Sequence, residues 1–372
     1  MQRVGITGQS GFIGSFLFNF LGAYPEKFER IYFDKHFFEQ ESLLDSFVEK
    51  CDIIVHLAAV NRHSDPEAIY QTNIGLTSKL INSLKRTRSN AHVLFASSTQ
   101  EINENAYGKS KKDSRHLLIK WAETGQGKFT GLIIPNVFGP FGHPYHNSVI
   151  ATFCHQLTHN EMPSIDVDAK LKLIYVGELV QQIVGIINEN VIVDNLEIAF
   201  TAETKVSDIL KLLEQFKADY LQQGIIPLLL NNFDVNLFNT FRCYMDIANS
   251  NPIRFAKHTD ERGSFAELVK LNIGGQVSFS VTLPGMTRGN HFHTRKIERF
   301  VVIKGEALIQ LRKIGSTDVL NFYVSGNEPA FVDMPIWYTH NIKNIGSEDL
   351  YTVFWINEFY NNSDPDTFYE TV

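Results

Sequence analysis

The sequence predicts an α/β domain built on a doubly wound parallel sheet, followed by an all-β domain of antiparallel strands. A length of 372 residues suggests two domains, at roughly 100 to 200 residues per domain. The first half alternates β-rich runs with helical stretches, and the last third consists of short alternating strands. A hydrophobic content of 44% with 20% charged residues is typical of globular proteins.

In the first half, the pattern predicts both strands and helices. We expect strands over residues 4–7, 31–33, 53–57, 93–96 and 132–134, and helices over residues 12–21, 74–84 and 109–122. Strands that alternate with helices in this way predict a parallel sheet covered by helices.

From about Phe255 onward, we expect strands over residues 276–283, 297–304, 307–312, 318–324 and 351–356. Turn signals such as Pro284-Gly285 and Lys304-Gly305 separate them, which is typical of an antiparallel sandwich or barrel. A helical run over residues 206–221 and a polar, Asn-rich passage over 231–252 precede these strands. The predicted domains are therefore residues 1–246 and 247–372.

The charge pattern argues against some partners. Lys and Arg number 34 against 41 Asp and Glu, a formal net charge of −7, and no basic run is present, so nucleic acid is not an expected partner. We expect a cytoplasmic protein without membrane association, because no signal segment is apparent and no apolar run approaches ~18 residues. Three cysteines without CxxC spacing, Cys51, Cys154 and Cys243, argue against a disulfide framework and a thiolate metal site.

A glycine loop follows the first predicted strand. Gly8, Gly11 and Gly14 have GxxGxxG spacing and lead, with Phe12 and Ile13, into the first predicted helix. Glycines let a backbone approach a pyrophosphate, and the N-terminus of a helix favours its negative charge. The loop therefore predicts a dinucleotide site, although an ordinary strand-to-helix turn is the alternative.

The choice between NAD and NADP depends on the end of the second predicted strand. Asp34 stands where an acid would meet the adenosine ribose hydroxyl, which favours NAD. Lys35 and His36 follow directly and could hold a 2′-phosphate, which favours NADPH over NADH. The sequence leaves both cofactors open.

A phenol and an ammonium lie four residues apart at Tyr107 and Lys111, hence on one face of a helix. At that distance we expect the cation to lower the pKa of the phenol, which could then protonate a carbonyl. Ser98 ends the strand just before them, where its hydroxyl could contact the same substrate oxygen. This combination favours hydride transfer over simple nucleotide binding.

These residues, with His56-Leu57-Ala58-Ala59 and Asn136-Val137-Phe138-Gly139-Pro140, resemble the extended short-chain dehydrogenases that act on nucleotide sugars. The resemblance spans roughly residues 1–240. It implies a Rossmann-like fold and assigns a role to each matching residue: Tyr107 as the acid/base, Lys111 as its electrostatic partner and a ribose contact, Ser98 as the group that orients the oxygen, Leu57, Ala58 and Ala59 as cofactor contacts, and Asn136 as a substrate contact. The family commonly has Arg where this chain has Ile133, and Asn136 could instead simply form the turn before Gly139.

A second group of candidate ligands lies in the all-β half. His291 and His293 share one face of a predicted strand, and Glu298 and His340 could arrive from adjacent strands to close a site of three nitrogens and one oxygen. Such a set suits zinc, iron, manganese or nickel, of which zinc is favoured. Four candidate ligands in this order within a β-rich domain argue against the alternative, a chance set of exposed polar side chains.

This spacing resembles the cupins, which implies a jelly-roll fold over residues 255–372, although Trp337 stands where the family usually has Gly. The segments Asp260–Glu267 and Arg288–His291 also resemble the dTDP-4-dehydrorhamnose 3,5-epimerase branch of sugar cupins, in which the His at the position of His291 is the proton-abstracting base. One nitrogen cannot bind a metal and accept a proton at the same time. Lys296 and Tyr338 are therefore alternative candidates for an acid or base.

The pairing of the two domains resembles the bifunctional enzymes of capsular polysaccharide synthesis. Segments 55–62 and 147–154 add to this resemblance, and Asn147 and Ser148 are expected substrate contacts. It implies C3 epimerisation of a UDP-2-acetamido-2,6-dideoxy-4-hexulose in the cupin, followed by NAD(P)H-dependent C4 reduction, toward UDP-N-acetyl-L-fucosamine. It also implies a homodimer formed through the cupin. The alternatives are a reductase whose metal-bearing cupin only dimerises, and a nucleotide-sensing regulatory protein.

Overall fold

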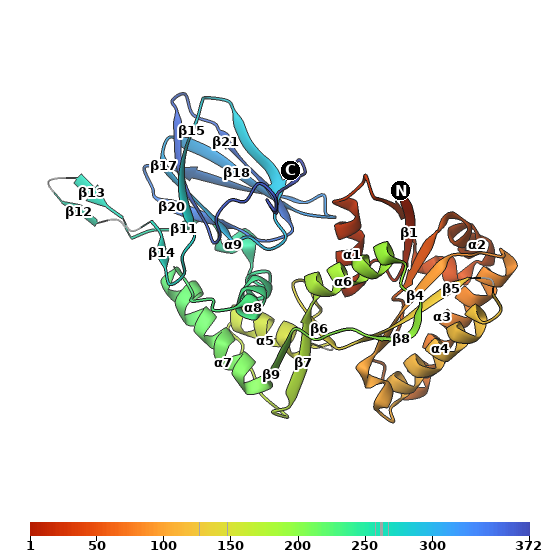
Figure 1. Cartoon of the computed structure of the whole chain (residues 1–372). Coiled ribbons are helices and arrows are strands. Elements are labelled where there is room, and N and C mark those ends of the chain that lie inside the picture. The colour runs from red at the N-terminus through yellow and green to blue at the C-terminus, as the bar shows by residue number, and fades with distance from the viewer. Residues whose placement is uncertain (126, 147, 257, 261–262, 267) are drawn as a thin grey trace. The chain divides into compact units, whose positions relative to one another are not determined.

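The structure is a computed structural model that describes residues 1–372 except 126, 147, 257, 261–262 and 267. By its internal contacts the chain divides into two compact units (Figure 1). The first comprises residues 1–138, 142–149 and 168–206, and the second comprises residues 139–141, 150–167 and 207–372. No helix among the described residues has both the length and the apolar character needed to cross a membrane.

The first unit is built on a six-stranded sheet with the order β2-β1-β3-β4-β5-β8, and each neighbouring pair is parallel. Its strands are β1 (Gln2–Thr7), β2 (Phe28–Ile31), β3 (Ile53–His56), β4 (His92–Ser98), β5 (Lys128–Ile134) and β8 (Val193–Glu197). A small sheet in the same unit contains β6 (Asn136–Phe138), β7 (Lys170–Tyr175) and β9 (Ala202–Lys205). All four residues of β3 are buried, as expected for a strand covered on both faces.

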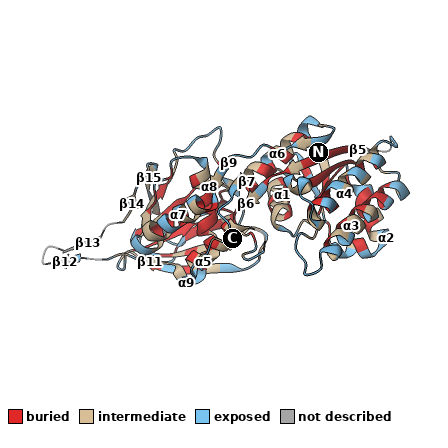
Figure 2. Cartoon of the chain, turned by 90° about the horizontal axis from the view of Figure 1, so that it is seen from below, coloured by how far each residue is buried: buried red, intermediate tan, exposed pale blue. Residues whose placement is uncertain are grey.

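Helices cover the main sheet, as Figure 2 shows by the burial of its strands. Three of them contribute to one apolar core with β3, β4 and β5: α2 (Glu41–Lys50), α3 (Pro66–Arg86) and α4 (Ala106–Ala122). The helices α1 (Phe12–Gly22) and α6 (Val176–Glu189) contact each other, and the short 3₁₀ helices are η1 (Lys35–Glu39) and η2 (Thr99–Ile102). Strands β2 and β3 lie on opposite sides of β1, so the chain connections leave β1 and β3 in opposite directions. In open α/β sheets, this reversal of strand order opens a crevice at the carboxyl ends of the two strands, here β1 and β3.

The second unit contains two five-stranded antiparallel sheets, with the orders β11-β20-β17-β22-β15 and β19-β18-β21-β16-β23. The first sheet consists of β11 (Ile253–Arg254), β15 (Gln276–Thr282), β17 (Glu298–Lys304), β20 (Ala330–Met334) and β22 (Leu350–Ile356). The second consists of β16 (Thr287–Phe292), β18 (Glu306–Lys313), β19 (Val319–Ser325), β21 (Tyr338–Asn344) and β23 (Phe368–Tyr369). Both sheets contribute to one apolar core. The predicted fold class, a Rossmann-like sheet followed by a cupin jelly roll, is confirmed.

Helical segments also belong to the second unit. They are most of α5 (Val149–Thr158), α7 (Val206–Phe216), the π-helical turn η3 (Lys217–Gln222), α8 (Asn232–Arg242) and α9 (Ile247–Ser250). The remaining strands pair as β10 (Ile225–Ile226) with β14 (Lys270–Leu271), and as β12 (His258–Asp260) with β13 (Gly263–Phe265). Residues 207–246, placed in the first domain by sequence reasoning, thus pack with the β-rich unit.

A buried polar network explains that packing. The carboxylate of Asp333 in β20 accepts two hydrogen bonds from Arg299 in β17, at 2.8 and 2.9 Å, and one from the Tyr220 hydroxyl in η3. Arg242 in α8 donates to Tyr220 at 3.3 Å and to the carbonyl of Met334 at 3.2 Å. Because a buried charge is costly without partners, these contacts hold the helices against the sheet.

Two local expectations are refined by the structure. The second strand covers Phe28–Ile31, earlier than the predicted 31–33. Trp337, in a position where cupins usually have Gly, adopts the left-handed conformation that Gly favours, with φ 61°. Its ring stacks on Phe292 with centroids 5.4 Å apart, which helps to offset the backbone strain.

Candidate active site and metal centre

The glycine loop lies where β1 passes into α1. Gly8 has φ +78°, and a Cβ on it would lie 2.9 Å from the backbone nitrogen of Ala58. A Cβ on Gly14 would lie 2.2 Å from the carbonyl oxygen of Gly8. Gly11 is the N-cap of α1 and provides no side chain to accept from the first helical N–H groups. The loop is therefore closely packed, with helical N–H donors available to an anion.

A cleft of about 360 Å³ opens beside this loop. It gathers most of the residues expected to bind the cofactor and all three expected to act on the substrate carbonyl: Gly8, Gly11, Phe12, Ile13, Gly14, Leu57, Ala59, Ser98, Tyr107 and Lys111. The expected substrate contacts Asn136 and Ser148 also line it, whereas Asn147 lies outside the described residues. Ala58, Asp34, Lys35 and His36 are not among its lining residues.

Tyr107 and Lys111 lie one helical turn apart at the start of α4, the former half-buried and the latter buried. The Lys111 ammonium donates to the carbonyl of Ala96 at 2.8 Å and lies 5.8 Å from the centroid of the Tyr107 ring. Burial raises the pKa of Tyr107 to about 12 and lowers the pKa of Lys111 to about 8. The expected lowering of the phenol pKa by the cation is thus wrong for the ligand-free chain, because desolvation dominates.

Ser98 ends β4 and serves as the N-cap of η2, where its hydroxyl accepts a hydrogen bond from the N–H of Gln100 at 3.1 Å. The same strand supplies the Ala96 carbonyl that holds Lys111. One strand end therefore positions both the hydroxyl and the ammonium at the carboxyl edge of the sheet, where ligands bind in open α/β folds.

Asp34 is paired within its own turn. Its carboxylate accepts a hydrogen bond from the N–H of His36 at 3.0 Å and lies 2.6 Å from Nδ1 of the His36 ring. These hydrogen bonds hold the pKa of Asp34 below its ordinary value. Asp34, expected to contact the ribose hydroxyl, and His36, expected to contact a 2′-phosphate, therefore contact each other in this structure.

Sequence reasoning did not single out Asn61, Gln100, His143 and His146, which also line the cleft. Tyr145 and His146 are tied to the loop that follows β3: Arg62 donates to their carbonyls at 2.8 and 2.7 Å, and Asn61 Oδ1 lies 3.1 Å from Nε2 of His146. Segment 55–62, which contributed to the resemblance to the capsular polysaccharide enzymes, contains Asn61 and Arg62 and was the signal for this part of the cleft.

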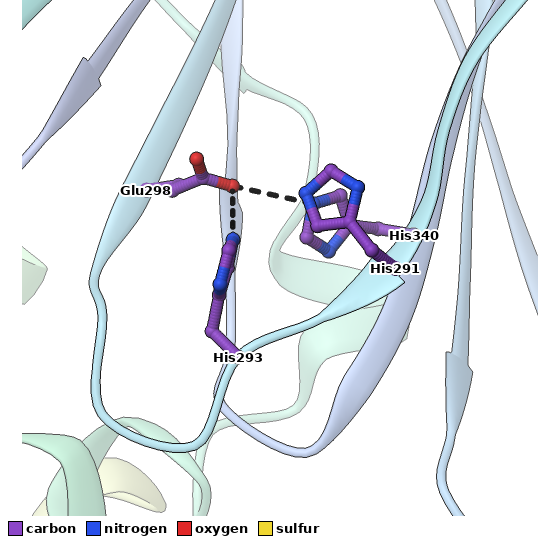
Figure 3. Close-up of side chains that lie close together, drawn as sticks. All are labelled: His291, His293, Glu298 and His340. Atoms are coloured by element: carbon purple, nitrogen blue, oxygen red, sulfur yellow. Dashed lines mark ion pairs between the residues drawn. The ribbon is translucent and has the colours of Figure 1, made fainter. Parts of the chain in front are cut away.

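The second unit brings together the four predicted ligands. His291 is in β16, His293 directly follows it, Glu298 begins β17 and His340 is in β21. One ligand atom from each residue lies within 4.8 Å of those of the other three (Figure 3). Oε2 of Glu298 is 3.1 Å from Nε2 of His293 and 3.2 Å from Nε2 of His340.

The donor atoms fit a divalent cation. Nε2 of His293, Nε2 of His340 and Oε2 of Glu298 are buried and have no hydrogen-bond partner beyond one another among the described residues. The Nδ1 atoms face carbonyl oxygens, that of Asp366 for His293 and that of Tyr338 for His340, the latter at 3.3 Å. A protonated Nδ1 leaves the Nε2 lone pair directed at the centre, as metal-binding histidines require.

The two alternative candidates for an acid or base, Lys296 and Tyr338, contact other groups. The Lys296 ammonium donates to the carbonyl of Pro365 at 2.6 Å and lies 3.8 Å from the carboxylate of Glu358. The Tyr338 ring lies 6.3 Å from that of Phe141, and burial raises the pKa of its hydroxyl. His291 is half-buried and is the most exposed of the four clustered residues.

Two family profiles match the two halves of the chain. The NAD dependent epimerase/dehydratase family matches residues 4–199. The polysaccharide biosynthesis C-terminal domain matches residues 258–368.

Several known proteins are similar to this chain. A Pseudomonas aeruginosa protein named UDP-2-acetamido-2,6-beta-L-arabino-hexul-4-ose reductase is 29% identical over 375 residues, covering 99% of this chain and 98% of the relative. The crystal structure of the capsular polysaccharide assembling protein CapF from Staphylococcus aureus matches with a TM-score of 0.62 and 31% identity over 100% of both chains. RMD from Pseudomonas aeruginosa, solved with NADPH, matches 59% of this chain and 83% of its own, with a TM-score of 0.53 and 19% identity, and shows the fold alone.

Proposed function

This chain belongs to the NAD dependent epimerase/dehydratase family, and we propose that it carries out two consecutive steps in the synthesis of a capsular polysaccharide precursor. The cupin epimerises C3 of a UDP-2-acetamido-2,6-dideoxy-4-hexulose. The first domain then reduces the C4 ketone with NAD(P)H, toward UDP-N-acetyl-L-fucosamine. The observation that carries the proposal is one cleft that joins the glycine loop to Ser98, Tyr107 and Lys111.

The reductive step follows from the state of the phenol. A dihydronicotinamide bound in the cleft would supply a hydride to C4. The Tyr107 hydroxyl is protonated at neutral pH, because its pKa is raised to about 12, and it can donate that proton to the oxygen as negative charge develops there. Ser98 would orient the same oxygen, and the Lys111 ammonium would add a positive charge close to it.

The order of the two steps follows from carbonyl chemistry. A ketone at C4 acidifies the hydrogen at C3, because the carbanion left by proton removal is delocalised onto the oxygen as an enolate. A base removes that proton and an acid returns one to the opposite face, which inverts C3. Once C4 is an alcohol, the C3 hydrogen is no longer acidic. Epimerisation must therefore precede reduction.

We assign His291, His293, Glu298 and His340 as the ligands of one divalent ion, with zinc favoured. When bound, such an ion supplies Lewis acidity toward a carbonyl oxygen. The buried Nε2 and Oε2 atoms that face one another support this assignment. With His291 bound to the ion, the C3 proton is removed by another group of the cupin.

A second candidate has support in the comparisons, because the full-length Pseudomonas relative is named only as a reductase. In that case the cupin would hold a metal and join two copies of the chain without acting on C3. Deuterium incorporation at C3 of the 4-keto UDP-sugar in D₂O, without NAD(P)H, distinguishes the two.

We expect enzyme-dependent deuterium incorporation at C3 before any cofactor is added, followed by cofactor oxidation once NADPH is present. The control is Tyr107→Phe, which should exchange deuterium at the wild-type rate because this phenol lies in the other domain. Absence of exchange, with normal reduction of a pre-epimerised substrate, would support the reductase with a structural cupin.

A further inference from the structure

The carboxylate of Asp366 lies beneath the segment that connects two of the candidate metal ligands. It accepts hydrogen bonds from the N–H groups of Thr294, Arg295 and Lys296 at 3.0, 3.0 and 3.1 Å, and from the Thr294 hydroxyl at 2.6 Å. Asp366 itself is only 4% exposed. A buried carboxylate that receives four hydrogen bonds is a strong local constraint.

From this geometry we infer that Asp366 is a positioning residue for the metal centre, which fixes both the loop between His293 and Glu298 and the orientation of the His293 ring. The inference rests on the metal site proposed above. It concerns a residue of the C-terminal segment that contacts no expected reacting atom.

The first part of the inference concerns the loop. Residues 294–297 join His293, which follows β16, to Glu298, which begins β17. Three of the four loop N–H groups point at one carboxylate, so the loop encloses an anion contributed from about 70 residues further along the chain. Without that anion, these N–H groups would lose their common acceptor, and the spacing between the two ligands would no longer be fixed.

The second part concerns the His293 ring. Nδ1 of His293 donates to the backbone carbonyl of Asp366, which requires the proton on Nδ1 and leaves the lone pair on Nε2. The carbonyl is aimed by an unusual backbone, because Asp366 has φ 40°, in the left-handed region that Asp and Asn tolerate better than most residues. One residue therefore acts on His293 through its carbonyl and on the adjoining loop through its side chain.

The C-terminal segment holds Asp366 in this place. Glu370 donates its N–H to the carbonyl of Asn290 at 2.9 Å, and the Thr339 hydroxyl donates to the carbonyl of Glu370. Strand β23 also pairs with β16 opposite His291. The tail thus packs along the two strands that carry His291 and His340.

The test is the zinc affinity of Asp366→Asn, measured by competition with a chromogenic chelator. Asn keeps the size and the left-handed backbone but replaces an acceptor by an NH₂ group that faces N–H donors. We expect zinc affinity to fall about 10- to 100-fold, the range for loss of a partner behind a metal ligand. The visible absorption of the Co²⁺-substituted protein should change as well, because the ligand geometry relaxes.

The matched control is Asp364→Asn, which makes the same charge change two residues away. Asp364 is 65% exposed in its side chain and pairs with Arg295 at 2.9 Å, so we expect its zinc affinity to stay within about twofold of wild type. If Asp366→Asn does not fold, Thr294→Val removes only the hydroxyl donor to Asp366 and should weaken zinc binding about two- to fivefold.

The outcomes separate the two proposals. Wild-type protein that binds no zinc would overturn the metal site and this inference with it. If wild type binds zinc and folded Asp366→Asn binds it with equal affinity, only the positioning role is overturned. If Asp366→Asn does not fold, equal zinc affinity of Thr294→Val and wild type has the same meaning. Equal losses in Asp366→Asn and Asp364→Asn would also overturn it, because a general effect of charge would explain both.

Discussion

The Lys111 ammonium is held by the carbonyl of Ala96 and lies 5.8 Å from the centroid of the Tyr107 ring. Its position is thus set by the end of β4. Burial then sets the protonation of both groups: the phenol stays neutral far above physiological pH, while the ammonium begins to lose its proton near pH 8. This arrangement suits a phenol that donates a proton.

Replacing Tyr107 with Phe should lower kcat for NAD(P)H oxidation about 10²- to 10⁴-fold, because a positioned proton donor contributes on that order. Stopped-flow or steady-state absorbance of the reduced cofactor measures this. Tyr70→Phe is the matched control, since the Tyr70 hydroxyl donates to Asp113 at 2.8 Å and does not line the main cleft. Near wild-type reduction by Tyr107→Phe would refute the role of this phenol.

The pH profile of reduction should report Lys111. Its pKa is lowered from 10.5 to about 8 by burial, so the ammonium is charged below pH 8 and neutral above it. We therefore expect kcat/KM to be level near neutral pH and to fall tenfold per pH unit well above pH 8, while Tyr107 stays protonated. A kcat/KM that remains level up to pH 10 would contradict this prediction. The same holds for a slow substrate that makes hydride transfer rate-limiting: its kcat/KM must also fall above pH 8.

The cofactor preference should depend on the pair formed by Asp34 and His36. We expect NADPH to be preferred over NADH in kcat/KM, because Lys35 and His36 can neutralise a 2′-phosphate, although Asp34 repels it. Asp34→Asn should strengthen the preference for NADPH, and His36→Ala should weaken it. A clear NADH preference in the wild type would show that the Asp34 carboxylate decides the specificity.

Replacing Arg62 with Ala should raise KM for the nucleotide sugar by roughly 10-fold while the Kd for the reduced cofactor stays unchanged. Arg62 holds two carbonyls of the segment 142–149, and the loss of hydrogen bonds from a charged donor is worth about 1.5–3 kcal/mol. Arg62→Lys, which keeps a cationic donor, should restore part of the loss. Equal effects on substrate and cofactor would indicate a general disturbance of the cleft.

Replacing His340 with Ala should release the divalent ion and stop C3 exchange, because the centre loses one of its four ligands. Reduction of an already epimerised 4-keto substrate should persist, since the residues assigned to it lie in the other domain. Metal content and both activities are measured on the same preparation. Wild-type protein purified without chelator that contains no metal would refute the ligand assignment and restore His291 as the candidate base.

Features that depend on short-range spacing could be predicted without the fold. Glycine is required at positions 8 and 14, because the turn before α1 leaves no room for a Cβ there. The four metal-ligand candidates were predictable because strand alternation puts His291 and His293 on one face. Alternation does not extend to His340, which the pairing of β16 with β21 places opposite His291 in the folded chain.

The fold established how distant segments meet. Arg62 reaches carbonyls 83 and 84 residues away, and Asp366 reaches His293 across 73 residues. It also decided that residues 207–246 pack with the β-rich unit and that the pKa of Tyr107 rises rather than falls. Local periodicity carries no information on such contacts, because they and the burial that shifts a pKa arise from the packing of the whole chain.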